Sequence, residues 1–529
     1  MATMAMGMVQ KHKYFLVAVM LSLPSLVFAN EFVFDPTVKL KETYSDNVNS
    51  SSQNKESSFV TQASLNLNTT YATHKATYNL NAEATYAAYT HDSDLNSGYI
   101  SLEGNYAIQL WPNGLSLIGS ASIQNSANDT SSNIYADIIT ADTVQISKYT
   151  SGLAYNSSNS QYNLSSNLIY NTTETEDNIA EFSGFSAMLN STNGNGVNHV
   201  FWELTNNYRE RENRNRTSRS YQSETKIGLI TPYKINPFIR YYDEDNSGNL
   251  GSGRNIESNS YGAGIRWLLT PKLLVDLSYN IPLDKDQSEN QQNDNYYDVD
   301  INWEPSIRTS LNASFSQRFY GDSYGLNFTH KNKRLTNTIS YDESIQSFTR
   351  NNFMLVNDGA FLCPPDLVAF SFEQCFIDNT GEVDTDNFIV IPRLQLVEDD
   401  IFSLNKRLNW TSSLALGRTT LELSVQRNKR LNLSTNVEGL RQNIDFSISR
   451  KISDYSTLKF LTEYTETNNF INSPQEQYSK YRYYKLTLNR KLNKTLSFDI
   501  NLSHLNRVSN PAIYVYKENR IGLEIKKVL

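Results

Sequence analysis

Strict alternation of apolar and polar residues is the feature that most constrains how this 529-residue chain can fold. Within residues 303–334, Leu311, Ala313 and Phe315 occupy alternate positions, and polar residues stand between them. Successive side chains of a β-strand point to opposite faces, so this pattern predicts strands with one apolar and one polar face. The alternation recurs to the C-terminus, and useful stretches with a helical period are absent, so we expect an all-β protein.

The connections between the expected strands are of two kinds, which alternate along the chain. The strands span about 10–14 residues, which is long for a soluble sheet and suitable for a tilted membrane strand. Short connections rich in turn-forming residues lie at 111–114, 231–237, 269–272, 304–306, 452–456 and 492–495. Longer polar connections lie at 124–143, 243–258, 284–295, 347–400 and 468–478. In this order, the short connections predict periplasmic turns and the long ones predict outer loops.

We therefore expect a transmembrane antiparallel outer-membrane β-barrel of about 24 strands, within a range of about 22–26, an even number as single-chain barrels require. Only closure into a barrel satisfies every backbone group of a sheet in lipid. The alternative is a secreted soluble sandwich or β-solenoid. That fold would not need two classes of connection, and it would give no use to the Tyr and Phe residues at strand ends, which form interfacial girdles in a barrel.

The barrel assigns each face of the 303–334 segment to a solvent. The residues expected to face lipid are Leu311, Phe315, Tyr324, Leu326 and Phe328. The residues expected to face a watery lumen are Asn312, Ser314, Ser316, Arg318, Asn327 and Thr329.

The first 29 residues have the features of a secretory signal peptide. Basic residues (Lys11, His12 and Lys13) precede an apolar core at 14–23, and small residues precede a cleavage site after Ala29. An anchored helix is the less favoured alternative, because Pro24 interrupts the core and the core is short for a membrane span. We expect export of the chain, a single barrel domain over 30–529, and location in the outer membrane.

Three motifs give the chain a resemblance to a known family. They are "WEPSIRTSLNAS" from Trp303, "RFYGDSY" from Arg318 and "SYDE" from Ser340. The segment 303–343 resembles the PEP-CTERM system-associated outer-membrane β-barrel family of Gram-negative bacteria, which accompanies exosortase and exopolysaccharide gene clusters. The resemblance implies a role in polysaccharide export or surface assembly at the outer membrane. It implies no catalytic residues.

The connection at 347–400 contains both cysteines of the chain, Cys363 and Cys375. A close pair in an exported protein predicts a disulfide, and neither the spacing nor the neighbouring residues favour a metal or redox site. The stretch "LCPPDLVAFSFEQCF" is more apolar than an exposed loop should be. We therefore expect it to fold into or over the lumen as a lid, clipped by the disulfide.

An arginine-rich stretch at 209–219 is expected at the outer rim. Its five arginines are Arg209, Arg211, Arg214, Arg216 and Arg219. Guanidinium groups bind phosphate and carboxylate bidentately, which favours contact with lipopolysaccharide or another anionic glycan. A charged, soluble rim that Glu210 and Glu212 partly neutralise is an equally good interpretation. Export and the net charge of −8 argue against binding of nucleic acid.

The sequence offers little for catalysis or metal binding. His504 with Ser503 and Asp499 is the least poor candidate for a hydrolase, but adjacent strand residues point to opposite faces. The stretch 243–254 resembles a calcium loop, yet its twelfth position is Arg254 where such a loop needs Glu. We expect no enzyme activity, no cofactor and no metal site.

The predicted width of the barrel indicates its function. About 24 strands exceed the 16–18 that already leave an aqueous channel. A lumen rich in Asn, Ser, Thr and Gln suits hydroxylated chains, so the leading hypothesis is a pore or secretion channel for a surface polysaccharide, working with periplasmic export proteins. The alternative is a non-conducting scaffold for assembly of polysaccharide or sorted proteins.

Overall fold

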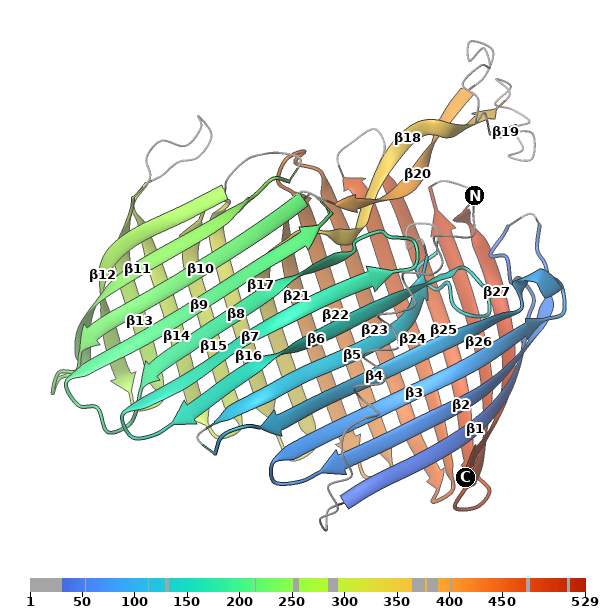
Figure 1. Ribbon diagram of the computed structural model, residues 1–529, viewed down its shortest axis with the longest axis horizontal. Coiled ribbons are helices and arrows are strands. Elements are labelled where there is room, and N and C mark those ends of the chain that lie inside the picture. The colour runs from blue at the N-terminus through green and yellow to red at the C-terminus, as the bar shows by residue number, and fades with distance from the viewer. Residues whose placement is uncertain are drawn as a thin grey trace.

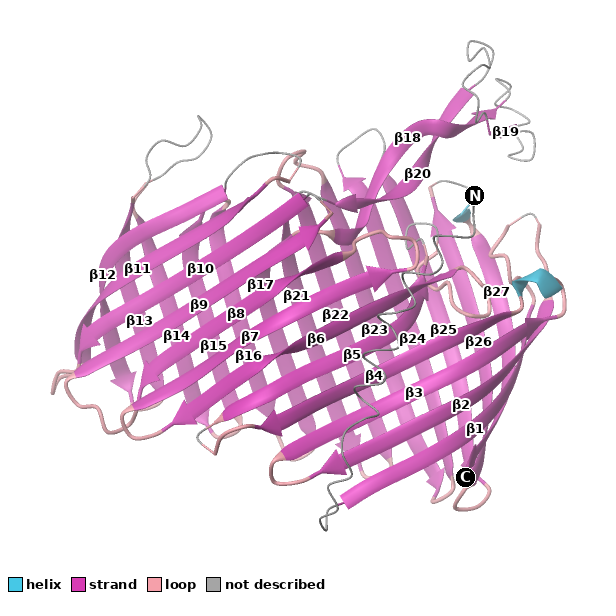
Figure 2. Cartoon of the chain, in the orientation of Figure 1, coloured by secondary structure: helices cyan, strands magenta, loops and turns pink. Residues whose placement is uncertain are grey.

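The computed structural model describes residues 31–529 except 53, 113, 129–132, 215, 251–255, 284–293, 364–375, 378–388, 400–401, 472–475 and 511–513, and for residue 31 and the strands between 349 and 399 it describes the backbone alone. The chain forms a closed antiparallel barrel of 24 strands (Figures 1 and 2). Neighbouring strands in the sequence pair with each other, and β1 pairs with β27 to close the sheet. This architecture confirms the predicted outer-membrane-type barrel.

The strands of the first part of the barrel are β1 (Glu31–Ser45), β2 (Ser58–Ala72), β3 (Ala76–Tyr89), β4 (Ser97–Gln109), β5 (Leu115–Ala127), β6 (Thr143–Ser158), β7 (Tyr162–Thr175), β8 (Phe182–Asn193), β9 (Val200–Asn213), β10 (Arg216–Leu229), β11 (Ile235–Gly248) and β12 (Ile256–Thr270). The remainder are β13 (Leu273–Pro282), β14 (Tyr296–Ser306), β15 (Thr309–Arg318), β16 (Gly321–Lys331), β17 (Leu335–Gln346), β21 (Ser403–Leu416), β22 (Thr419–Asn432), β23 (Glu438–Ser453), β24 (Ser456–Ile471), β25 (Gln477–Lys491), β26 (Leu496–Ser509) and β27 (Tyr516–Val528). A 3-10 turn, η1 (Ser93–Leu95), interrupts the connection between β3 and β4. The described part of the chain contains no helix with the length and apolar character of a membrane span.

The strand register confirms which residues share a face. In the β15–β16 pair, Leu311 lies opposite Phe328 and Phe315 opposite Tyr324, whereas Asn312 lies opposite Asn327. Arg318 continues the Asn312 face, and its guanidinium bonds to the carboxylate of Glu244 on β11, inside the barrel. The polar face is therefore the lumen face, and the apolar face points outward, as predicted.

The turns also follow the predicted order, with one small shift. Short turns join β4 to β5, β10 to β11, β12 to β13, β23 to β24 and β25 to β26 within one residue of the predicted stretches. The turn expected at 304–306 falls later, because β14 continues through Ser306. The longer connections lie at the opposite end of the barrel, which is the outer end in the predicted orientation (Figure 1).

The barrel bends tightly at β10–β14. The ammonium of Lys226 on β10 contacts the carboxylate of Asp300 on β14, four strands away. Glycines on the lumen face of β12 allow this curvature, because a Cβ at Gly264 would lie 2.5 Å from the carbonyl oxygen of Leu277 and 2.6 Å from the ring of Phe238. A larger residue there would displace the backbone or the ring.

Buried ion pairs hold the lumen face of this bend together. Arg240 Nε lies 2.8 Å from Glu224 Oε1, and Arg240 Nη2 lies 3.0 Å from Asp298 Oδ2. Arg266 binds Asp276 in a bidentate pair at 2.8 and 2.7 Å. The Arg240 side chain is 2% exposed, so its charge depends on these partners rather than on water.

The segment between β17 and β21 carries strands of its own. It forms a separate small sheet of β18 (Thr349–Cys363), β19 (Phe376–Ile377) and β20 (Ile389–Asp399). The β18–β20 hairpin projects beyond the outer rim (Figure 1). Residues 364–375, which make up most of the apolar stretch expected to fold into or over the lumen as a lid, lie outside the described residues. The lid and the Cys363–Cys375 disulfide therefore stay predictions.

Candidate functional site

The periplasmic half of the lumen is lined by water-accessible polar side chains. Asn79 and Asn81 on β3 and Glu103 and Asn105 on β4 are exposed and lie on the lumen face. The carboxamide of Asn79 donates to Asn105 Oδ1 at 3.1 Å, and that of Asn66 donates to Asn81 Oδ1 at 2.7 Å. These carboxamides form a polar ladder along the wall, and their exposure shows that this half of the lumen is open to water.

The outer half of the lumen is packed. Along the lumen face of β2, Asn68 near the periplasmic end is exposed, whereas Gln62, Val60 and Ser58 toward the outer end are 8%, 0% and 2% exposed. On the lumen face of β25, Tyr481 is fully buried near the outer end. The lumen is therefore wide and wet on one side and filled on the other.

Residues 133–142, between β5 and β6, fill one side of the outer half. We call them the infolded segment. Tyr135 contacts the rings of Tyr481 and Tyr483 on β25, with ring centroids 5.5 and 5.3 Å apart, and its hydroxyl donates to Glu463 Oε2 on β24 at 3.1 Å. Burial raises the pKa of the Tyr135 phenol, so it stays protonated and can donate this bond. Asp137 forms an ion pair of 2.6 Å with Arg520 on β27.

Further contacts of the infolded segment lie on the neighbouring walls. The hydroxyl of Tyr516 on β27 donates to Asn133 Oδ1 at 2.9 Å, and the hydroxyl of Tyr89 on β3 donates to the carbonyl of Ile138. Ile139 is 3% exposed and packs in a cluster with Val60 and other residues of β2 and β3. Each of these strand partners lies on a lumen face, which places the segment inside the barrel.

The local sequence explains why this loop turns inward. Asp137 Oδ1 accepts from the backbone N–H of Ile139 at 3.0 Å and of Thr140 at 3.3 Å, which forms a tight turn. This turn presents apolar residues on one side, and they bury against the wall. The sequence of 124–143 predicts a polar outer loop, so the inward position of residues 133–142 was not expected. The apolar stretch 134–139 was the available signal.

On the other side of the outer end, opposite walls of the barrel meet. Arg211 on β9 donates to the carbonyl of Ser347 at 2.7 Å, and Ser218 Oγ on β10 lies 2.8 Å from Ser347 Oγ, just after β17. Phe348 and Phe402, which flank the projecting hairpin, pack with Leu250 from the β11–β12 connection. These contacts bridge the rim at the base of the hairpin.

The five rim arginines lie in different surroundings. Arg209, Arg211 and Arg216 lie on the lumen face, Arg219 lies on the outward face 3.6 Å from Glu210, and Arg214 lies in the turn with φ of 53°. Arg211 also stacks over Phe182 at 4.4 Å. They do not form one continuous surface, and their contact with an anionic glycan stays a prediction.

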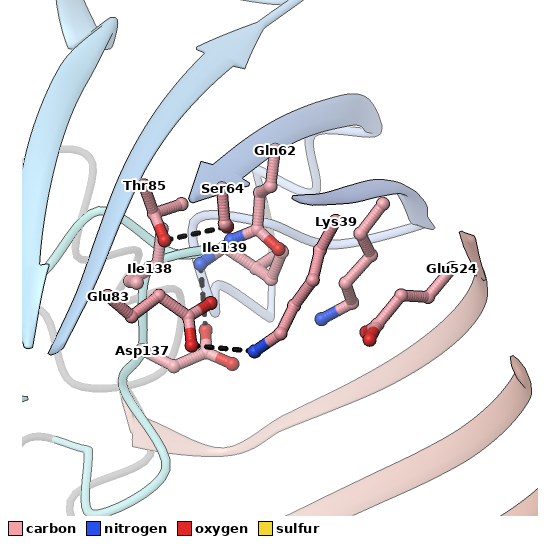
Figure 3. Close-up of a pocket in the computed structure, with 10 residues that line it drawn as sticks. Lys39, Gln62, Ser64, Glu83, Thr85, Asp137, Ile138, Ile139 and Glu524 are labelled. Atoms are coloured by element: carbon pink, nitrogen blue, oxygen red, sulfur yellow. Dashed lines mark hydrogen bonds and ion pairs between the residues drawn. The ribbon is translucent and has the colours of Figure 1, made fainter. Parts of the chain in front are cut away.

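A cavity of about 250 Å³ lies between the infolded segment and the wall (Figure 3). Lys39 and Lys41 on β1, Gln62 on β2 and Glu83 on β3 line it from the wall. Asp137 lines it from the infolded segment, and Glu524 lines it from β27. Lys39 Nζ lies 2.6 Å from Glu83 Oε2, and Lys41 pairs in register with Glu524. We call this the lumen cavity.

The groups tested for chemistry in the sequence do not assemble into a reactive site. Glu224, Asp298 and Asp300 are the one carboxylate group, among the described residues, close enough to hold a metal ion. The cations of Lys226 and Arg240 already contact these carboxylates, so we do not assign a metal there.

The two remaining candidates from the sequence also fail on geometry. Ser503 faces the lumen, whereas His504 faces outward and bonds to Asn519 at 2.8 Å. Asp243 and Asp245 lie in extended strand β11, where they cannot form a calcium-binding loop.

Comparison with known proteins adds a family match and distant structural likenesses. The family model described as "Putative beta-barrel porin 2" matches residues 29–174, a little over a quarter of the chain. No curated protein matches the sequence.

Among the solved structures that the chain resembles are three outer-membrane barrels. A mutant of the ferric enterobactin receptor PfeA from Pseudomonas aeruginosa has a TM-score of 0.41 and 10% identity, over 94% of this chain and 80% of that chain. The siderophore receptor PirA from Acinetobacter baumannii has a TM-score of 0.43 and 9% identity, over 95% of this chain and 81% of that chain. The FrpB iron transporter from Neisseria meningitidis has a TM-score of 0.40 and 10% identity, over 93% of this chain and 82% of that chain. At these scores, the likeness carries no inference about what this chain binds.

Proposed function

We propose that this chain is a porin-like channel of the outer membrane that conducts polar solutes and has no catalytic activity. The observation that carries the proposal is the water-accessible polar lumen face of the periplasmic half, with Asn79, Asn81 and Asn105 exposed inside a closed 24-stranded barrel. Barrels of 16–18 strands already leave an aqueous channel, so 24 strands leave room for passage. The match of residues 29–174 to a porin family supports the same function.

The packed outer half gives the proposal a second part. The infolded segment and the Ser347 contacts fill or bridge the outer end, so the channel is narrow or closed there. Passage requires the infolded segment to move or solutes to pass beside it. The non-conducting scaffold is the alternative that this closure favours, and conductance measurements separate the two.

We further propose that the cargo is a surface polysaccharide exported with a PEP-CTERM system, in contact with periplasmic export proteins and, at the rim arginines, with lipopolysaccharide. The motifs of 303–343 and the exposed carboxamide ladder support this cargo, because carboxamides exchange hydrogen bonds with hydroxyl groups without requiring a charge.

Deletion of the gene in its native host tests this cargo. We expect polysaccharide to disappear from the cell surface and to accumulate in the periplasm, because the exit is lost while synthesis continues. Fractionation with sugar analysis measures both pools, and complementation with the intact gene should restore the surface pool. Unchanged surface polysaccharide in the deletion strain would exclude this cargo and leave a general porin.

A further inference from the structure

We propose that the lumen cavity is a binding subsite for one uncharged, polyhydroxylated unit, about the size of a single sugar ring. This inference deepens the proposed function, since it names the chemistry of a solute that would pause in the lumen. It rests on the geometry of the cavity between the infolded segment and strands β1–β3 and β27.

The carboxamide of Gln62 is open to the cavity. Gln62 is 8% exposed as a whole residue, and its carboxamide makes no hydrogen bond with any residue of the described chain. It extends into the cavity between Lys39 and the infolded segment (Figure 3). A carboxamide offers two donor hydrogens and an acceptor oxygen. Gln62 is therefore placed to bond to a solute in the cavity.

Charges of both signs line the cavity. Two ammonium groups, Lys39 and Lys41, face the carboxylates of Glu83 and Glu524, and Asp137 shares Arg520 with Glu518. An anionic solute would meet the carboxylates and a cationic solute would meet the ammonium groups. This mixture of charges favours a solute without net charge.

Hydroxyl groups fit this arrangement better than a zwitterion does. The Lys39–Glu83 pair is closed at 2.6 Å, so a zwitterion would have to break it to insert its own charges. A hydroxyl group donates and accepts at once, so it can bond to the spare hydrogens of Lys39 and the spare lone pairs of Glu83 while the pair stays intact.

The size and the approach to the cavity agree with a single sugar ring. A cavity of about 250 Å³ has room for one sugar ring. The carboxamide ladder continues from the cavity toward the periplasmic end, because Asn66 bonds to Asn81 and its amide lies 3.5 Å from Glu83. A solute from the periplasmic half can therefore reach the cavity along polar groups.

Binding to the full-length barrel in detergent micelles tests the subsite without any need for transport. Saturation-transfer NMR would be recorded with D-glucose, and with glycine and sodium acetate as the zwitterionic and anionic probes. We expect saturable binding of glucose alone. Gln62→Ala should weaken it by about fivefold, the effect of one lost hydrogen bond. Gln426→Ala, on the lumen face of β22 and outside both the cavity and the carboxamide ladder, should leave it unchanged.

Each other outcome would overturn the subsite. Absence of saturable glucose binding, equal binding of glycine or acetate, or unchanged affinity in Gln62→Ala would do so, provided that the variant runs as a folded barrel on an unheated gel. Failure here is distinct from failure of the channel. Conductance without glucose binding would refute only the subsite proposal. Glucose binding without conductance in any variant of the barrel would refute the channel proposal and leave the subsite proposal standing.

Discussion

Release of the infolded segment from the lumen wall should raise the single-channel conductance several-fold in planar bilayers. The variant combines Tyr135→Ser, Asp137→Asn, Ile138→Ser and Ile139→Ser. These changes remove the ring contacts with β25, the ion pair with Arg520 and the apolar packing against β2 and β3. The segment would then leave the outer half of the lumen, and water and ions would replace it.

The matched control changes an outer loop that stays outside the lumen. Asp92, Asp94 and Leu95 around η1 are exposed, so the combined variant Asp92→Asn, Asp94→Asn and Leu95→Ser should conduct like the unmodified barrel. Equal conductance of the released variant and this control would show that the infolded segment does not limit passage. Absence of conductance in all forms would favour the scaffold over the channel.

Substitution of Arg240 by Ala should lower the free energy of unfolding by about 3–5 kcal/mol, the cost of leaving buried charges without a partner. Arg240 is 2% exposed and binds Glu224 and Asp298. Without it, Glu224 keeps its longer pair with Lys226 at 3.6 Å, and Asp298 loses its 3.0 Å pair with Arg240. Urea unfolding of the barrel in lipid vesicles, followed by tryptophan fluorescence, measures the loss.

Two comparisons make this prediction specific to burial. Arg219→Ala removes a pair whose side chains are 59% and 31% exposed, so it should cost only about 0–1 kcal/mol. The triple variant Arg240→Leu, Glu224→Gln and Asp298→Asn should recover most of the lost stability, because no unpaired charge remains. If Arg240→Ala and Arg219→Ala had the same small effect, the ion pairs would not hold the bend.

The sequence predicted the barrel well because its main signal is local. A strand residue faces lipid or water according to its position in the alternation. The faces of Leu311 and Asn312 can therefore be predicted without knowing which residues lie opposite them. The turn chemistry then sets the strand order. Even the one misplaced turn, at 304–306, is shifted only because β14 extends through a Pro and a Ser.

The interior of the lumen was not predictable in the same way. Tyr135 bonds to Glu463, 328 residues away, and Arg211 bonds to Ser347, 136 residues away. Such contacts depend on where the closed sheet places its walls, and no periodicity encodes them. Arg211 illustrates the consequence, because the sequence grouped it with four other arginines as a rim surface, whereas packing against Phe182 gives it a structural role.

Cysteine labelling tests directly whether the lumen is wet on the periplasmic side and packed at the outer end. In a background with Cys363→Ser and Cys375→Ser, single cysteines would replace Asn105 on the open lumen face, Leu102 on the outward face of the same strand and Ser58 in the packed outer half. A membrane-impermeant maleimide would be added to the periplasmic side of the reconstituted barrel. We expect fast labelling at Asn105→Cys and slow labelling at Leu102→Cys and Ser58→Cys. Fast labelling at Leu102→Cys with protection of Asn105→Cys would contradict this expectation.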